Sequence, residues 1–89
     1  MPTSTLIVMD AVIVDVNPDA GTLTVKDDRS HDTWTIAVGT DTRILGPDAG
    51  SVALGDLRIG ANVQIRGRSR IPWILIAEEV SVQEEQRKP

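Results

Sequence analysis

The sequence predicts an all-β domain, a small closed barrel of five strands with a short helical turn between the third and the fourth. Valine, isoleucine and threonine dominate the middle of the chain, and their branched Cβ atoms suit a pleated surface better than a helix. Aromatic residues make up 2% of the chain, with Trp34 and Trp73 as the only members. Short alternating segments are separated by turn residues, as in small β-barrels. The core of this barrel must therefore be aliphatic.

The first hairpin is predicted from two alternating segments around a turn. Residues 5–16 carry apolar side chains on both faces in places, which is typical of a strand shared between two sides of a closed barrel. The stretch Asn-Pro-Asp-Ala-Gly at residues 17–21 has the composition of a tight turn. Residues 22–27 then place Leu23 and Val25 on one face. This segment is the second strand.

The third strand is predicted at residues 33–38. Three apolar side chains share one of its faces, and they are Trp34, Ile36 and Val38. We expect residues 39–45 to end this strand, with Ile44 or Leu45 still buried. Residues 52–60 then change period, because Leu54 and Leu57 lie three positions apart. A short helical turn fits that spacing.

The fourth and fifth strands are predicted at residues 61–67 and 73–82, with residues 68–72 turning the chain between them. The last strand alternates cleanly only if one extra residue is inserted near Glu78 and Glu79. We therefore expect a β-bulge at that point, which would direct four side chains inward, namely Leu75, Ala77, Val80 and Val82.

The chain divides into one domain at residues 5–82 and two tails, at residues 1–4 and 83–89. Cysteine is absent, which excludes thiol catalysis and thiolate metal sites. A net charge of −4 disfavours broad affinity for nucleic acid and anionic membranes. The early apolar stretch is too short for a membrane helix and lacks the basic start of a signal peptide. A cytoplasmic location is therefore the default expectation.

Four stretches of the chain carry a resemblance to a known family: VIVDVNPDAGTLTV, VGTDTRI, LGDLRIGANVQIRG and ILIAEEVSV. Together they resemble an uncharacterised family of small bacterial β-barrels of unknown function, over residues 11–82. The resemblance implies an OB-like barrel. It implies no chemistry, because the most regular positions of the family correspond to packing or turn residues, namely Leu57, Gly60, Val63, Ile65 and Gly67.

No metal or other cofactor is expected. The chain is also similar in general shape to periplasmic copper-carrier barrels, but its single histidine, His31, has Trp34 and no methionine nearby. Asp27, Asp28 and Asp32 could hold a hard cation weakly, yet they lack the order of a calcium loop, and a solvated acidic loop is the simpler interpretation.

An enzyme is not expected, because no nucleophile, base and oxyanion arrangement can be named. His31 has Ser30 as its only neighbouring hydroxyl, and an exposed loop histidine is the better interpretation. Glu78 and Glu79 are adjacent, but neighbours on a strand point to opposite faces. Neither pair of residues suggests acid and base chemistry.

The candidate binding residues are three arginines and a tryptophan, Arg66, Arg68, Arg70 and Trp73. The arginines alternate along a strand, so they could contact successive phosphates of a single nucleic-acid strand. They could equally be solvated residues paired with Glu78, Glu79 or nearby aspartates. The nucleic-acid interpretation lacks the aromatic side chains on which bases stack.

Trp73 follows Ile71 and Pro72, and this apolar group would suit a protein interface if the hairpin tip is exposed. Trp73 could instead cap the open end of the barrel. The preferred hypothesis is a non-enzymatic binding module with a protein partner or self-association. The alternative is a weak binder of single-stranded nucleic acid or another polyanion through the arginine row. A dimer through imperfectly closed edges of the third and fifth strands is also possible.

Overall fold

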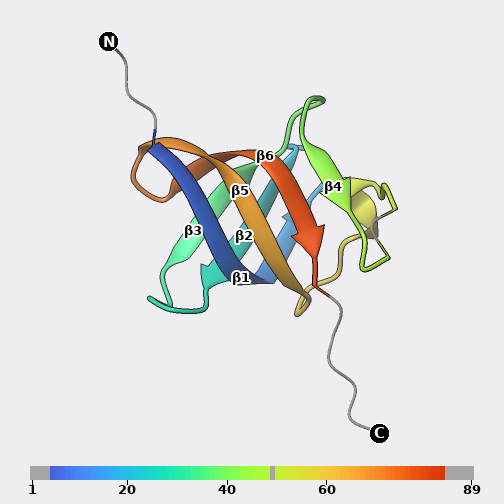
Figure 1. Ribbon diagram of the computed structural model, residues 1–89, viewed down its shortest axis with the longest axis horizontal. Coiled ribbons are helices and arrows are strands. Elements are labelled where there is room, and N and C mark those ends of the chain that lie inside the picture. Colours follow the sequence, from blue (N-terminus) through green and yellow to red (C-terminus); the bar gives the residue numbers. More distant parts are fainter. Residues whose placement is uncertain (1–4, 49, 84–89) are drawn as a thin grey trace, which may run out of the picture.

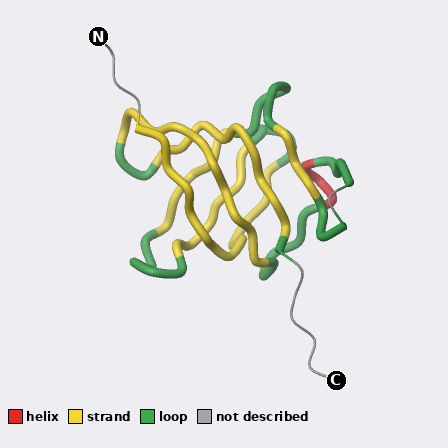
Figure 2. Tube along the Cα trace, viewed as in Figure 1, coloured by secondary structure: helices red, strands yellow, loops and turns green. Residues whose placement is uncertain are grey.

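Five strands close into a barrel in the computed structural model, which describes residues 5–48 and 50–83. Figures 1 and 2 show the strands wrapping around one interior, with the short helical turn at one end. The strand order is β3-β2-β1-β5-β6, and β6 pairs with β3 in parallel to close the barrel. The elements in chain order are β1 (Thr5–Asn17), β2 (Thr22–Asp27), β3 (Thr33–Ala37), β4 (Arg43–Leu45), η1 (Leu54–Asp56), β5 (Asn62–Ile71) and β6 (Ile74–Val82).

β1 belongs to two sides of the barrel, as its apolar pattern predicts. Its first part, from Thr5 to Val12, pairs antiparallel with β5, and its second part, from Ala11 to Asn17, pairs with β2. The register of the second pairing shifts between Ile13 and Asp15, which marks a bulge. A bulge bends a strand, and this bend lets β1 pass from one partner to the other.

The turn between β5 and β6 differs from the sequence prediction. β5 continues to Ile71, and only Pro72 and Trp73 form the turn, whereas the prediction ended that strand before residue 68. Proline at the first central position and a positive φ at the second is the pattern of a type II turn, and Trp73 has φ 71°. The sequence predicts a turn here, at residues 68–72, but not this two-residue turn, because a glycine normally occupies its second position.

The predicted bulge in β6 is confirmed. Arg66 pairs with Glu79 while its neighbour Gly67 pairs with Ala77, so Glu78 is the inserted residue. The inward set is also as predicted, because Leu75, Ala77 and Val80 are buried and Val82 packs against the core.

Residues 43–45 form a separate short strand, β4, instead of the end of the third strand. β4 pairs in parallel with β6 and buries Ile44. Before it, the Thr42 hydroxyl donates a hydrogen bond to the Ala77 carbonyl at 2.7 Å and accepts one from the Gly39 amide at 3.0 Å. The first of these bonds satisfies the Ala77 carbonyl of β6 beside its bulge. The predicted helical turn is present as η1, between β4 and β5.

The core is aliphatic, as the composition predicts. Within the described residues no polar or charged side chain is buried. The buried residues come from every strand and from the residue after η1, and they are Met9, Ala11, Ile13, Leu23, Val25, Ile36, Ile44, Leu57, Val63, Ile65, Leu75, Ala77 and Val80. Side chains that alternate inward from all strands therefore fill the barrel.

The expected open edge between the third and last strands is not found. Thr35, Ile36 and Ala37 of β3 pair with Ile74, Leu75 and Ile76 of β6, and the Thr35 amide also donates to the Trp73 carbonyl at 2.8 Å. A dimer through that edge is therefore ruled out along these residues. Of the predicted tails at residues 1–4 and 83–89, the structure describes only Gln83, whose amide donates to the Asn62 carbonyl at 2.8 Å. Residues 1–4 and 84–89 lie outside the described residues.

Candidate interaction surface

Arg66 and Arg68 lie on the outside of β5 and face carboxylates of β6. The Arg68 Nε lies 3.1 Å from a carboxylate oxygen of Glu78, and an Arg66 terminal nitrogen lies 4.0 Å from one of Glu79. All four side chains are at least partly exposed. Arg66 and Arg68 therefore lie beside glutamates of the neighbouring strand, which is the second of the two interpretations that the sequence allowed. Such exposed pairs contribute about 0–1 kcal/mol to stability.

The structure describes two side chains of the predicted row of three arginines, those of Arg66 and Arg68. The side chain of Arg70 lies outside the described part of the structure. The pairing of β5 with β6 shifts register between Arg68 and Ile71. Arg66 and Arg68 each lie beside a glutamate, which lowers their attraction for a phosphate backbone.

The outside of β1, β5 and β6 exposes aliphatic side chains that sequence reasoning did not select. Leu6 and Ile76 lie on either side of Arg68, because β1 pairs Leu6 with Arg68 and β6 pairs Ile76 with Arg68. Leu6 is 50% exposed and Ile76 is 59% exposed. Exposed aliphatic side chains that gather on one face of a domain are often part of an interaction site.

We refer to this surface as the outer face. It lies over three neighbouring strands, which run side by side across the front of the barrel in Figure 1. Its two arginines lie on the middle strand, β5, between the aliphatic side chains of β1 and those of β6, and the two bulge glutamates lie beside the arginines. Its residues are Leu6, Val8, Arg66, Arg68, Ile71, Ile74, Ile76, Glu78 and Glu79.

The sequence held a signal for the outer face. Residues 6 and 8 of β1 and residues 74 and 76 of β6 are apolar, although the side chains of residues 7, 9, 75 and 77 fill the inward positions. A strand that faces water on its outside normally alternates with polar residues. Apolar residues at the outward positions of two strands are therefore a signal, readable in the sequence, for an apolar outer surface.

Trp73 lies at the end of the barrel beside Trp34. The centres of the two rings are 5.4 Å apart and the ring planes are inclined by 70°, an edge-to-face arrangement. Trp34 packs against the core, while Trp73 remains 50% exposed. Trp73 therefore covers the end of the barrel with part of its ring and leaves the rest accessible.

The loop between β2 and β3 is organised by its own hydrogen bonds. A carboxylate oxygen of Asp27 accepts bonds from the amides of Arg29 and Ser30, at 2.8 and 3.4 Å, and the Ser30 hydroxyl accepts one from the Asp32 amide at 3.3 Å. His31 has φ 64°, and its amide donates to the Asp27 carbonyl. These residues shape a tight turn.

No group of three histidine, cysteine, aspartate or glutamate side chains that could hold a metal ion occurs within residues 5–48 and 50–83. In the loop just described, Asp27 directs a carboxylate oxygen to the backbone of its own turn. Asp28 donates its backbone amide to the Asp10 carbonyl of β1. The acidic residues of this loop thus hold the loop against β1.

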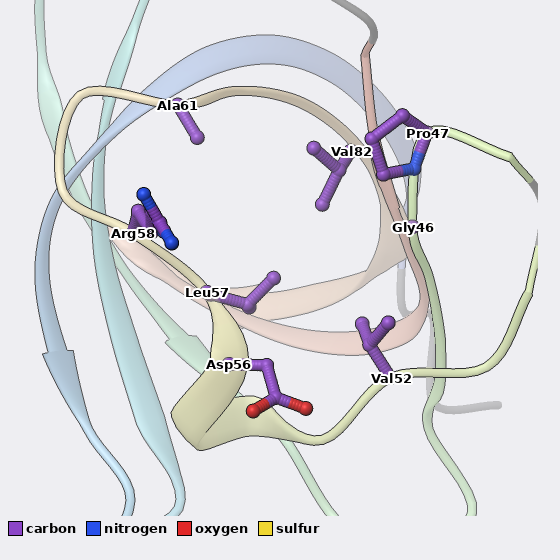
Figure 3. Close-up of a pocket in the computed structure, with 8 residues that line it drawn as sticks. All are labelled: Gly46, Pro47, Val52, Asp56, Leu57, Arg58, Ala61 and Val82. Carbon is purple, nitrogen blue, oxygen red and sulfur yellow. The ribbon is translucent and has the colours of Figure 1, made fainter.

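A small pocket of about 200 Å³ opens at the end of the barrel near η1 (Figure 3). Its lining is almost entirely apolar, with Asp56 and Arg58 as the charged members. One carboxylate oxygen of Asp56 accepts a bond from the Ala53 amide at 3.2 Å. The volume is below the ~300 Å³ at which pockets for drug-sized ligands begin, so it suits one aliphatic group. The remaining lining residues are Gly46, Pro47, Val52, Leu57, Ala61 and Val82.

The chain matches no protein-family model, no curated protein and no solved structure. Within the described residues, no helix has the length and apolar character needed to cross a membrane. The proposed function therefore rests on the geometry and exposure of the residues of the outer face.

Proposed function

We propose that this protein is a non-enzymatic interaction module, a small barrel that binds a protein surface through the outer face. The observation that carries the proposal is the group of exposed aliphatic side chains on three adjacent strands, which are Leu6 and Val8 on β1, Ile71 on β5, and Ile74 and Ile76 on β6. Burying such groups against a partner is favourable by roughly 25 cal/mol per Å² of apolar surface.

The partner surface that fits the outer face carries apolar groups on both sides of a central group of charges of both signs. The arginines and glutamates of the outer face occur in equal number and lie next to each other. A partner with a strong charge of one sign would meet as much repulsion as attraction. A protein surface that mixes apolar and polar groups has the composition of protein interfaces in general.

We also propose that the barrel is of the OB type. The supporting observations are the order β3-β2-β1-β5-β6, the parallel pairing of β3 with β6, and the turn η1 before β5. OB barrels that bind oligonucleotides use the face of their second and third strands. Here the outward residues of β2 and β3 include four threonines, Thr22, Thr24, Thr33 and Thr35, with Lys26 as a cation and no stacking aromatic ring among them.

The test introduces a photoreactive phenylalanine analogue at Ile76, in the outer face, and in a separate variant at Ile59. Ile59 is the matched control, because it is an exposed isoleucine, at 67%, that lies outside the outer face. The proposal expects cross-linking to a protein from position 76 and much less from position 59. The identified protein is then purified, and its affinity is measured for the unmodified chain, Ile76→Glu and Ile59→Glu.

Two results would contradict the proposal. One is equal cross-linking, or equal affinity, for the variants at positions 76 and 59. The other is tight binding of a single-stranded oligothymidine that weakens steeply as salt rises, since this dependence is the signature of phosphate contacts. An apolar interface should change little over the same salt range.

A further inference from the structure

We infer that the partner of the outer face is a second copy of this chain, so that two barrels pack face to face as a two-fold dimer. The inference rests on the proposed function, because it names the occupant of the same surface. It follows from the area of the outer face, its charge relative to the rest of the molecule, and the arrangement of its strands.

The exposed apolar area matches what a small dimer needs. Five aliphatic side chains of the outer face are about half exposed, and with the stems of Arg66 and Arg68 they offer on the order of 400 Å² of apolar surface per copy. A standard interface covers roughly 800 Å² per partner, of which somewhat more than half is apolar. The outer face is therefore large enough for a reversible dimer and too small for an obligate one.

The charge distribution is compatible with self-association through this face. The chain carries a net charge of −4, while the described charged side chains of the outer face are two arginines beside two glutamates, which balance. The net negative charge therefore lies elsewhere in the chain, where repulsion between copies opposes contact on average. Contact through the outer face does not meet this average repulsion.

A two-fold axis along β5 brings complementary groups together. Rotation about that axis places β1 of one copy over β6 of the other, so that Leu6 faces Ile76 twice in the dimer. The same rotation brings the two copies of Arg68 opposite each other at the axis, with Glu78 of one chain on one side and Glu78 of the other chain on the other side, so that positive and negative groups alternate around the axis. An interface of this kind is self-complementary, as a two-fold dimer requires, and its charges pair across the two chains.

The experiment is sedimentation velocity of the full chain over roughly three decades of concentration, compared with Ile76→Glu and Ile59→Glu. We expect the unmodified chain and Ile59→Glu to pass from monomer to dimer as concentration rises. Ile76→Glu should raise the dissociation constant about 100-fold or more, because each dimer loses two central anchors and gains two carboxylates there. The exposed site should tolerate the change, and equal unfolding midpoints of the two variants would show this.

A charge reversal adds a second readout. Arg68→Glu should weaken the dimer, and the double variant Arg68→Glu with Glu78→Arg should restore it, because the exchanged charges pair again. A strictly monomeric chain at every concentration, or equal dissociation constants for the variants at positions 76 and 59, would overturn the inference. If the chain is monomeric and position 76 cross-links to a different, identified protein, the second copy is refuted while the proposed function stands.

Discussion

Gly67→Ala should strongly destabilise the barrel, because Gly67 lies where the bulge of β6 presses on β5. A Cβ atom at position 67 would lie 2.5 Å from a methyl carbon of Leu75 and 2.9 Å from the Cα of Ala77, with the Ile76 carbonyl oxygen nearer than either. Real Cβ atoms essentially never approach within 3.0 Å of another heavy atom. Side-chain rotation relieves only the contact with Leu75, so the backbone of β6 has to move.

The cost of that movement is about 3 kcal/mol, at the upper end of what overpacking a core usually costs. For a domain of this size it corresponds to a fall in the melting temperature of roughly 12–24 °C. Urea unfolding followed by circular dichroism measures the change in the free energy of unfolding directly.

The matched control for this prediction is Gly39→Ala. A Cβ atom at Gly39 meets nothing within 4 Å, and no positive φ holds that residue in a conformation reserved for glycine. The control should be neutral, or more stable by about 0.5 kcal/mol, because alanine restricts the unfolded chain. Equal unfolding free energies for the two variants would show that β5 and β6 are not packed as described, and the reasoning would fail.

Two further predictions concern the hairpin of β5 and β6. Trp73→Gly should be more stable than Trp73→Ala by about 1 kcal/mol in urea unfolding, because both lose the contact with Trp34 but only glycine adopts a positive φ without strain; equal stabilities would contradict the turn. A double-mutant cycle of Arg68→Gln and Glu78→Gln should give a coupling of about 0.5 kcal/mol at low salt, falling towards zero near ~1 M salt. A coupling energy that does not change with salt concentration would mean that the pair is shielded from solvent.

The strand pattern was predictable because alternation reports burial directly. The bulge at Glu78 follows from the sequence alone, since only an inserted residue lets both Leu75 and Val80 point inward. The aliphatic core was predictable for the same reason. Both depend on the order of apolar residues along one strand, and a single sequence contains that order.

Features that depend on tertiary contacts were not predictable. β4 is three residues long, and it exists because Ile44 finds β6 to pair with. The turn at Trp73 uses a conformation that the residue type disfavours, and contact with Trp34 contributes to holding it. The outer face was not predicted for a related reason. Its apolar residues become neighbours of Arg66 and Arg68 only when β1 and β6 pair with β5 on either side.

The barrel has a seam, and its position has a consequence for how the molecule opens. β1 and β5 are joined through eight residue pairs, whereas β3 and β6 are joined through three. A pairing of so few residues separates early, since few hydrogen bonds and contacts offset the gain in chain entropy. Local opening of the barrel should therefore begin with the separation of β3 from β6, which would leave the hairpin of β5 and β6 paired with β1.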